Sequence, residues 1–344
     1  MGDIRRTQLL FSVLFVLLLG FITGARAAER TSDLIPTAKK EGRVVWYTTL
    51  DTPEANKLAV MFEERFPFLK VDVFRTGSGA LTNRILSEYR ANRHAVDVIV
   101  GTGSRGGVPT FKKDGIITTY KSPEVKFIAD DLKDKDGYWT SIYQLTYVLG
   151  YNKKLVKPED IPKTYEDLLK PIWKGKKISN DTENFVWFDT LLKYWGKEKG
   201  LAYFRKLAQQ DQVFQRGSPN RVQLMVAGEF ALAIAYAPHF QKYVTRGAPV
   251  DWVPLEPVVF FGLPLMIAKQ APHPVGARLL IDFLLSREAQ TQLRDFDRIP
   301  SRTDVDANPP RLFRGFERIA FDIGTDRDMN ELAALYNDTF GLKR

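Results

Sequence analysis

The chain has 344 residues, of which 44% are hydrophobic and 26% charged, and it contains no cysteine. These values are typical of a globular protein of about two domains and exclude a disordered or collagen-like chain. The absence of cysteine excludes disulfides, cysteine-ligated zinc, iron–sulfur clusters, a thiol nucleophile and a lipid-modified N-terminal cysteine. The formal net charge is +9. Because basic and acidic residues are interspersed, this charge predicts no nucleic-acid partner.

The N-terminus has the three parts of a secretory signal peptide. Arg5 and Arg6 precede an uncharged apolar run over residues 9–22, and Ala25-Arg26-Ala27 provides a cleavage site with small residues. The run is shorter than the ~20 residues that a membrane-spanning helix needs. We therefore expect cleavage after Ala27 and a monomeric protein in the bacterial periplasm, with no membrane insertion. The two arginines leave open whether export follows the Sec or the twin-arginine route.

Strands and helices alternate in the next part of the chain. Strands are predicted at residues 44–48, 71–74 and 96–100, which are short apolar runs rich in β-branched residues. Helices are predicted after two of them, beginning at Thr52-Pro53 and at Gly77-Ser78-Gly79. This alternation is typical of an open α/β sheet with parallel strands.

The second half of the sequence predicts further helices and two buried strands. The strands are expected at residues 230–236 and 258–268. Two helices, at residues 274–285 and 287–296, are separated by Ser286, which is a favourable N-cap residue.

Polar turns follow the predicted strands, at the edge of the sheet where open α/β proteins bind ligands. The turns combine hydroxyl groups, glycines and backbone amides, which attract anions at helix N-termini. Aromatic residues next to strand ends can line a cleft. Small residues also allow tight turns for purely structural reasons, so that alternative stays open. The candidate ligand-binding residues are Thr48, Thr49, Asp51, Gly77, Ser78, Gly79, Thr102, Gly103, Ser104, Tyr143, Asp181, Ser218 and Tyr236.

The sequence contains no recognised catalytic motif. His94, His239 and His273 have no metal-ligand spacing, and there is no nucleophile elbow, HExxH motif or P-loop. Gly77-Ser78-Gly79 lacks the third glycine of a dinucleotide fingerprint. We expect no enzymatic activity and no cofactor. Isolated groups near turns, such as Asp181 and His239, leave open a secreted hydrolase.

Several segments follow one another in a recognisable order along nearly the whole mature chain. They lie at residues 41–48, 77–79, 96–98, 136–139, 151–152, 167–169, 173–176 and 271–290. Together they resemble the bacterial extracellular solute-binding proteins of ABC importers. The last segment, which contains Ala271-Pro272-His273-Pro274 and Phe283-Leu284-Leu285-Ser286, is similar to the ferric-iron-binding branch of type 2 periplasmic binding proteins.

The resemblance implies an α/β protein of two lobes, each an open mixed sheet flanked by helices, with the ligand cleft between them. The hinge is implied near residues 136–143 and 254–260. The lobes would close on one small-molecule solute, and the closed form would dock on a membrane permease with its ATPase. The implied division is a signal peptide at 1–27, lobe 1 at 28–138, lobe 2 at 139–256, a return to lobe 1 at 257–303, and C-terminal helices of lobe 2 at 304–344.

The sequence departs from the iron-binding pattern at the expected metal ligands. Iron-binding members of the family use two adjacent tyrosines, usually helped by a histidine or glutamate from the first lobe. This chain has no Tyr-Tyr pair, and Tyr236 is its candidate iron ligand, while Thr49-Leu50-Asp51 stands where a histidine can occur. A small anionic or polar solute is therefore favoured over Fe³⁺ as the transported ligand. Nearby arginines that favour an anion are Arg75, Arg105 and Arg221.

Overall fold

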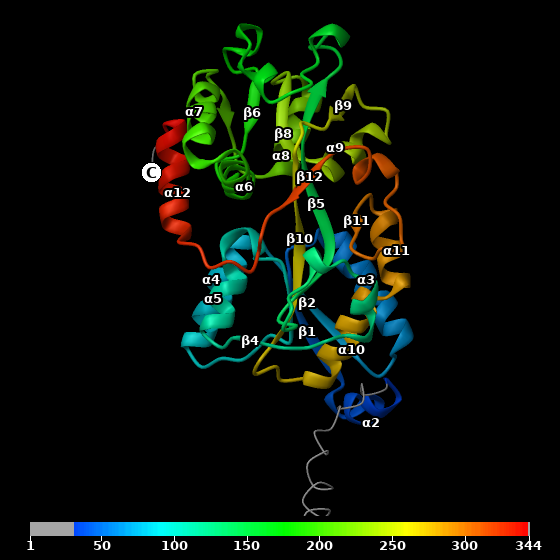
Figure 1. The fold of residues 1–344 in the computed structure, drawn as a ribbon. Helices are drawn as coiled ribbons and strands as arrows, with labels where there is room; N and C mark the ends of the chain where they lie inside the picture. Colours follow the sequence, from blue (N-terminus) through cyan, green and yellow to red (C-terminus); the bar gives the residue numbers. More distant parts are fainter. Residues whose placement is uncertain (1–30, 343–344) are drawn as a thin grey trace, which may run out of the picture.

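The computed structural model describes residues 31–342, and the expected signal peptide at residues 1–27 lies outside this part of the chain. Two lobes are stacked one above the other, and long strands run between them (Figure 1). The described residues form one twelve-stranded mixed sheet that continues through both lobes. Within this range, no helix combines the length and the hydropathy that crossing a membrane requires.

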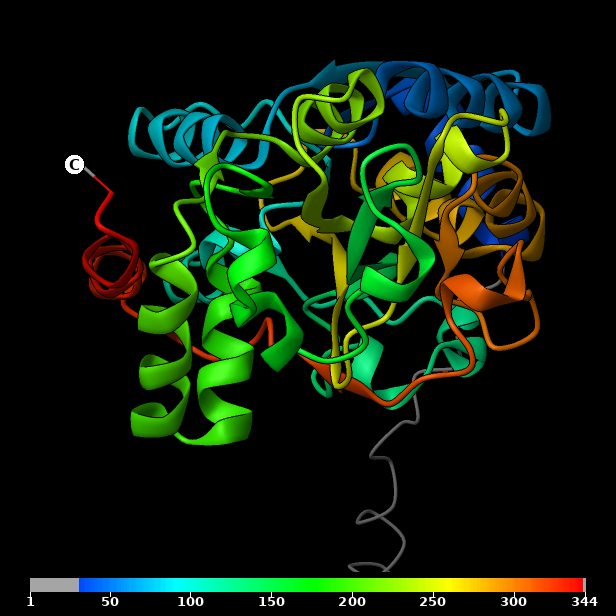
Figure 2. The same cartoon turned by 90° about the horizontal axis from the view of Figure 1, so that it is seen from above.

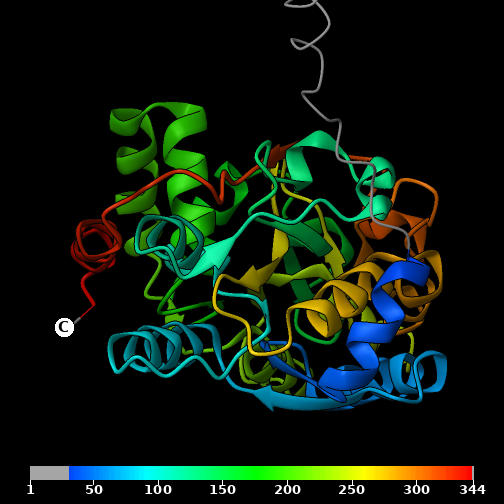
Figure 3. The same ribbon diagram turned by 90° about the horizontal axis from the view of Figure 1, so that it is seen from below.

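The first lobe is built on a parallel sheet with the order β2-β1-β3, as the alternation of strands and helices predicts. The third strand is shorter than expected, because residues 98–100 alone pair with β1. Viewed from below, helix α2 lies beside α10 (Figure 3), and Glu41 at its end accepts hydrogen bonds from the first amides of α10. The strands are β1 (Arg43–Thr48), β2 (Lys70–Arg75), β3 (Val98–Val100) and β4 (Ile117–Thr118), and the helices are α2 (Thr31–Glu41), α3 (Thr52–Arg65), α4 (Ser78–Arg90), α5 (Gly107–Lys113), α10 (Pro274–Leu285) and α11 (Arg287–Asp295).

The second lobe has its own group of strands and an aromatic core. Helices α6, α7 and α12 lie together on one flank (Figure 2), because Phe188, Phe204, Tyr336 and Phe340 pack with ring centroids 4.7–6.2 Å apart. The strands are β6 (Ile178–Asn180), β7 (Val213–Phe214), β8 (Leu232–Tyr236) and β9 (Val250–Val253), and the helices are α6 (Phe185–Trp195), α7 (Lys197–Ala208), α8 (Ser218–Ala227), α9 (Ala237–Val244) and α12 (Met329–Phe340).

Two long strands connect the lobes. In β5 (Thr140–Asn152), residues up to Thr146 pair with β10 (Val258–Ala268), and residues from Tyr147 onward pair with β8 and β9. Both strands are buried along nearly their whole length. Their first residues lie close to the predicted hinge segments. The short strand β11 (Ile299–Pro300) also pairs with β5.

The C-terminal segment makes a third connection, which the sequence did not predict. Residues 304–344 were expected to be helical, but β12 (Arg318–Ala320) pairs in parallel with the start of β10. The side chains of Ile323 and Met329 then lie against Gly103 and Gly106 of the first lobe before α12 packs on α6 and α7. The division of the chain at residues 138, 256 and 303 stays a prediction.

Candidate ligand-binding site

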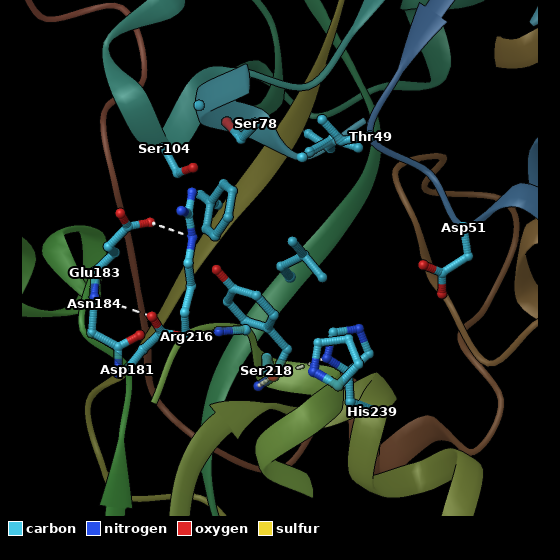
Figure 4. Close-up of a pocket in the computed structure, with 18 of the residues that line it drawn as sticks. Thr49, Asp51, Ser78, Ser104, Asp181, Glu183, Asn184, Arg216, Ser218 and His239 are labelled. Carbon is cyan, nitrogen blue, oxygen red and sulfur yellow. Dashed lines mark hydrogen bonds and ion pairs between the residues drawn. The ribbon is translucent and has the colours of Figure 1, made fainter. Parts of the chain in front are cut away.

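A cavity of about 280 Å³ lies between the lobes, and we call it the central cavity. The turns that follow β1, β2 and β3 line it from the first lobe, and those that follow β6, β7 and β8 line it from the second (Figure 4). Tyr143, Leu145 and Tyr147 of β5 and Phe261 and Leu263 of β10 form its inner wall. Its volume suits a small molecule.

The structure brings nearly all the predicted ligand-binding residues to this cavity. Thr48 and Gly103 are the exceptions and do not line it, so their part in ligand binding stays a prediction. Thr48 is fully buried, and its hydroxyl accepts a hydrogen bond from the Leu50 amide, which shapes the turn after β1. Gly103 faces Pro264 and Ile323 instead of the cavity. The predicted residues at the cavity are Thr49, Asp51, Gly77, Ser78, Gly79, Thr102, Ser104, Tyr143, Asp181, Ser218 and Tyr236.

Helix N-termini converge on the central cavity. Helices α4, α6 and α8 begin there, and their N-cap residues Gly77, Asn184 and Gly217 make no side-chain hydrogen bond to the first turn. The first-turn amides and the helix dipoles therefore present partial positive charge to a ligand. In the part of the chain that the structure describes, the hydroxyl oxygens of Ser78 and Thr102 are buried near these helix ends without a hydrogen-bond partner. These groups together can bind the oxygens of an anion.

Arg216 supplies a full positive charge in the central cavity. Its side chain extends from the second lobe toward Ser104 of the first lobe, and its Nε lies 3.4 Å from a carboxylate oxygen of Glu183 (Figure 4). The side chain of Arg216 is 67% exposed, so a solute can reach its guanidinium. No motif in the sequence singles out this residue, which stands beside the turn at Gly217.

Arg298 and Arg75 also line the cavity, but other groups neutralise their charges. The buried guanidinium of Arg298 lies 2.8 Å from Glu54 and 3.0 Å from Asp51. Burial raises the pKa of Glu54, and the charge of Arg298 opposes this shift. Arg75 also lies 3.6 Å from Asp51. This cluster fixes the turn before α3 and leaves little free charge for a solute.

Two tyrosines stand side by side on the inner wall, although the sequence contains no Tyr-Tyr pair. Tyr147 of β5 and Tyr236 of β8 are partners in the antiparallel ladder. Their hydroxyl oxygens are 3.1 Å apart. Burial raises the pKa of Tyr236 to about 12 and raises that of Tyr147 well above its usual value, so both phenols are neutral at pH 7 in the ligand-free chain. Tyr147 is part of the hydrophobic core and also lines the cavity.

The turn at Ser218 is held by a small network of hydrogen bonds. The Ser218 hydroxyl is 2.9 Å from Nδ1 of His239 and accepts a hydrogen bond from the Tyr236 amide. Burial lowers the pKa of His239, which keeps its imidazole neutral. Asp181 accepts hydrogen bonds from the Gly217 amide and from Arg221. The network positions the first turn of α8 at the cavity.

The other arginines and histidines singled out from the sequence have different roles. Arg221 does not line the cavity: it is 1% exposed and donates to Asp181 and to the Ile234 carbonyl. The side chain of Arg105 lies outside the described part of the structure. His273 donates through its backbone amide to the buried carboxylate of Asp97, which its Nδ1 also contacts. Among the described residues, no group of three histidines or carboxylates could hold a metal ion.

A two-lobed α/β fold with a polar cavity between the lobes defines a binding protein of the periplasmic type. Residues 94–320 match the sequence profile of the bacterial extracellular solute-binding proteins, and the chain belongs to this family. Similar curated proteins are the Iron uptake protein A1 of Synechocystis sp. (28% identity over 242 residues) and the Probable ABC transporter periplasmic-binding protein y4fP of Sinorhizobium fredii (26% over 113 residues). The alignments span 65% and 33% of this chain and 66% and 31% of these relatives.

Solved structures share the fold over nearly their whole length. The periplasmic binding protein AfuA of Actinobacillus pleuropneumoniae, with exogenous fructose-6-phosphate bound, has a TM-score of 0.76 at 24% identity, covering 88% of this chain and 99% of that chain. Iron-bound HitA of Pseudomonas aeruginosa has a TM-score of 0.71 at 19% identity, covering 86% and 99%. At this level of identity the likeness shows the two-lobed fold.

Proposed function

We propose that the chain is the periplasmic solute-binding subunit of an ABC importer. It closes its lobes on a small anionic or polar solute and delivers that solute, without covalent chemistry, to a membrane permease with its ATPase. The family, the two-lobed fold and the position of the central cavity support this role. A solute that contacts both lobes favours the closed form, because its affinity for that form is higher.

The observation that carries the choice of solute is the convergence of three helix N-termini without side-chain caps on the cavity. Arg216, Ser78 and Thr102 line the same cavity, and among the described residues the two hydroxyls have no hydrogen-bond partner. The carboxylates of Asp51 and Asp181 are already engaged by arginines and by a backbone amide. The solute is therefore a small molecule with a phosphate or carboxylate group and further hydroxyl groups.

A thermal-shift experiment tests this proposal. Wild-type protein is mixed with inorganic phosphate, hexose phosphates, hydroxycarboxylates and the matching neutral sugars. Binding to the native state raises Tm, since it adds RT ln(1 + [L]/Kd) to stability. We expect anionic compounds to raise Tm and neutral analogues not to. Arg216→Gln should weaken binding about tenfold or more, whereas Arg205→Gln, on the exposed side of α7, should not. Equal shifts with neutral sugars would contradict the proposal.

Ferric iron is a second candidate cargo, supported by the Tyr147–Tyr236 pair. Two phenolate oxygens suit a small, highly charged ion, and the chain resembles proteins whose names record iron uptake or bound iron. Because both pKa values are raised, iron would have to displace the phenol protons, and affinity would rise with pH. Loading with ferric citrate should then give a tyrosinate-to-iron absorption band that is lost in Tyr236→Phe and Tyr147→Phe. A colourless protein excludes this cargo.

A further inference from the structure

A second cavity of about 780 Å³ opens beside the central cavity, and we call it the side chamber. It lies between α3 and the turn after α11 in the first lobe and α8 and α9 in the second lobe. In Figure 1, α3, α9 and α11 lie on the side of the molecule opposite α12. The two cavities share Asp51, Arg75, Pro219, His239 and Arg298. The side chamber is therefore part of the same space between the lobes.

The charges around the side chamber are separated by lobe. The first-lobe wall carries Asp295 and Asp297, and the second-lobe wall carries Lys242 and Arg246. The remaining charges belong to the first lobe, where Arg75 and Arg298 are paired with Asp51 and Glu54. Opposite charges thus face each other across the space between the lobes.

These four facing groups are not satisfied by strong ion pairs in the structure. In the described part of the chain, Lys242, Arg246 and Asp297 have no ion-pair partner. Asp295 pairs with its neighbour Arg294, and that aspartate side chain is 50% exposed. Burial raises the pKa of Asp297, while the positive charges of Arg298, Arg246 and Lys242 act in the opposite direction. All four groups line this one cavity, so the two walls can interact electrostatically across it.

We propose that Asp295 and Asp297 of the first lobe and Lys242 and Arg246 of the second form an interlobe latch. When the lobes close, the side chamber narrows and these groups pair across it. The pairing favours closed arrangements even without solute, so part of the ligand-free population is closed. Without the latch, a solute must supply the whole free energy of closure. The latch therefore also raises the apparent affinity of the protein for the solute. This device works for any cargo and does not rest on the choice of solute.

The test measures the distance between the lobes in the ligand-free protein. Because the chain has no cysteine, Asn56→Cys on α3 and Ala202→Cys on α7, both exposed, take spin labels for double electron–electron resonance. We expect two distance populations, and we expect Lys242→Glu/Arg246→Glu to lower the ratio of closed to open molecules about two- to tenfold. Adding Asp295→Lys/Asp297→Lys should restore the ratio. Raising NaCl from about 20 mM to about 500 mM should lower it in the wild type, because salt screens these pairs.

The matched control is Arg205→Glu/Lys206→Glu, which makes the same change in net charge on the exposed side of α7. It should leave the distances as in the wild type. Distances that are the same in Lys242→Glu/Arg246→Glu and in the control would overturn the latch. Distances in the wild type that do not respond to salt would also overturn the latch. This measurement does not depend on any charge-reversal variant. If Lys242→Glu/Arg246→Glu weakens binding of fructose 6-phosphate without changing the distances, the side chamber is a solute subsite and the latch is also wrong.

Discussion

The hydroxyl oxygens of Tyr147 and Tyr236 lie 3.1 Å apart on the wall of the central cavity, although 89 residues separate them in the sequence. The ladder between β5 and β8 places them opposite each other, with ring centroids 4.7 Å apart. Tyr147 is buried, Tyr236 is half-buried, and one hydrogen bond joins their hydroxyls. The pair is therefore both part of the core and part of the cavity surface.

The first prediction concerns this pair. Tyr147→Phe or Tyr236→Phe leaves the remaining hydroxyl without this partner, which costs about 1–3 kcal/mol of unfolding free energy. The double variant loses both polar groups, so its cost should be smaller than the sum of the single costs by about 1 kcal/mol or more. Urea unfolding of the four proteins measures the difference. Strictly additive costs would show that water satisfies the remaining hydroxyl.

The second prediction concerns Arg298 and Glu54. Arg298→Met leaves the Glu54 carboxylate buried without its partner, and we expect a loss of about 3–5 kcal/mol. Combining it with Glu54→Leu should recover most of that loss, because a buried ion pair is often replaced by apolar residues at little cost. The control Arg314→Met, at an exposed ion pair with Asp306, should change stability by less than about 1 kcal/mol. Thermal or urea unfolding at pH 7 distinguishes these outcomes.

The third prediction is a pH dependence that arises from Asp282. Burial raises the pKa of this carboxyl to about 6, while Tyr120 donates hydrogen bonds to it. Its folded pKa lies above the unfolded value, so the folded chain binds the proton more tightly and loses stability as the pH rises from about 4 to about 6. Asp282→Asn should therefore stabilise the protein by about 1–3 kcal/mol at pH 7. The gain should vanish below about pH 4, and a gain that is independent of pH would contradict this cause.

The fourth prediction concerns the close contact between β5 and α9. A Cβ atom at Gly150 would overlap the ring of Phe240, which packs directly on the strand. We expect Gly150→Ala to destabilise the protein by about 1–3 kcal/mol through overpacking. Adding Phe240→Leu should relieve part of this cost. The control is Gly175→Ala, at a glycine that has open space around it but a φ of 85°. Any loss of stability there comes from the backbone conformation. Phe240→Leu should therefore not relieve it.

Much of the first lobe could be predicted because the sequence signals for its strands and helices are local. Short β-branched runs, Pro53 after Thr52 and the glycines at 77 and 79 fix strand and helix boundaries within a few residues. The same signals placed the polar turns at one edge of the sheet, and the structure gathers most of them in one cavity. Ser286, expected as an N-cap, accepts a hydrogen bond from the Ala289 amide.

The features that could not be predicted depend on pairing between distant segments. Tyr147 and Tyr236 meet only through the register of β5 and β8, and β12 forms only because β10 offers it an edge. Arg221 was expected among the arginines that favour an anion, but it is buried away from the cavity because Asp181 and the Ile234 carbonyl accept its hydrogen bonds. Periodicity within a segment carries no information about such partners.

The continuous strand β5 limits how the two lobes can move. Its amides and carbonyls are bonded to β10 on one side of residue 146 and to β8 and β9 on the other. Sliding one lobe past the other would break this ladder, whereas a small change of twist in each residue would preserve it. The lobes therefore open through a bending of strand β5, which they share. Amides in the middle of β5 should exchange with solvent slowly in both states, while the exchange rates of the turns around the central cavity report which state is present.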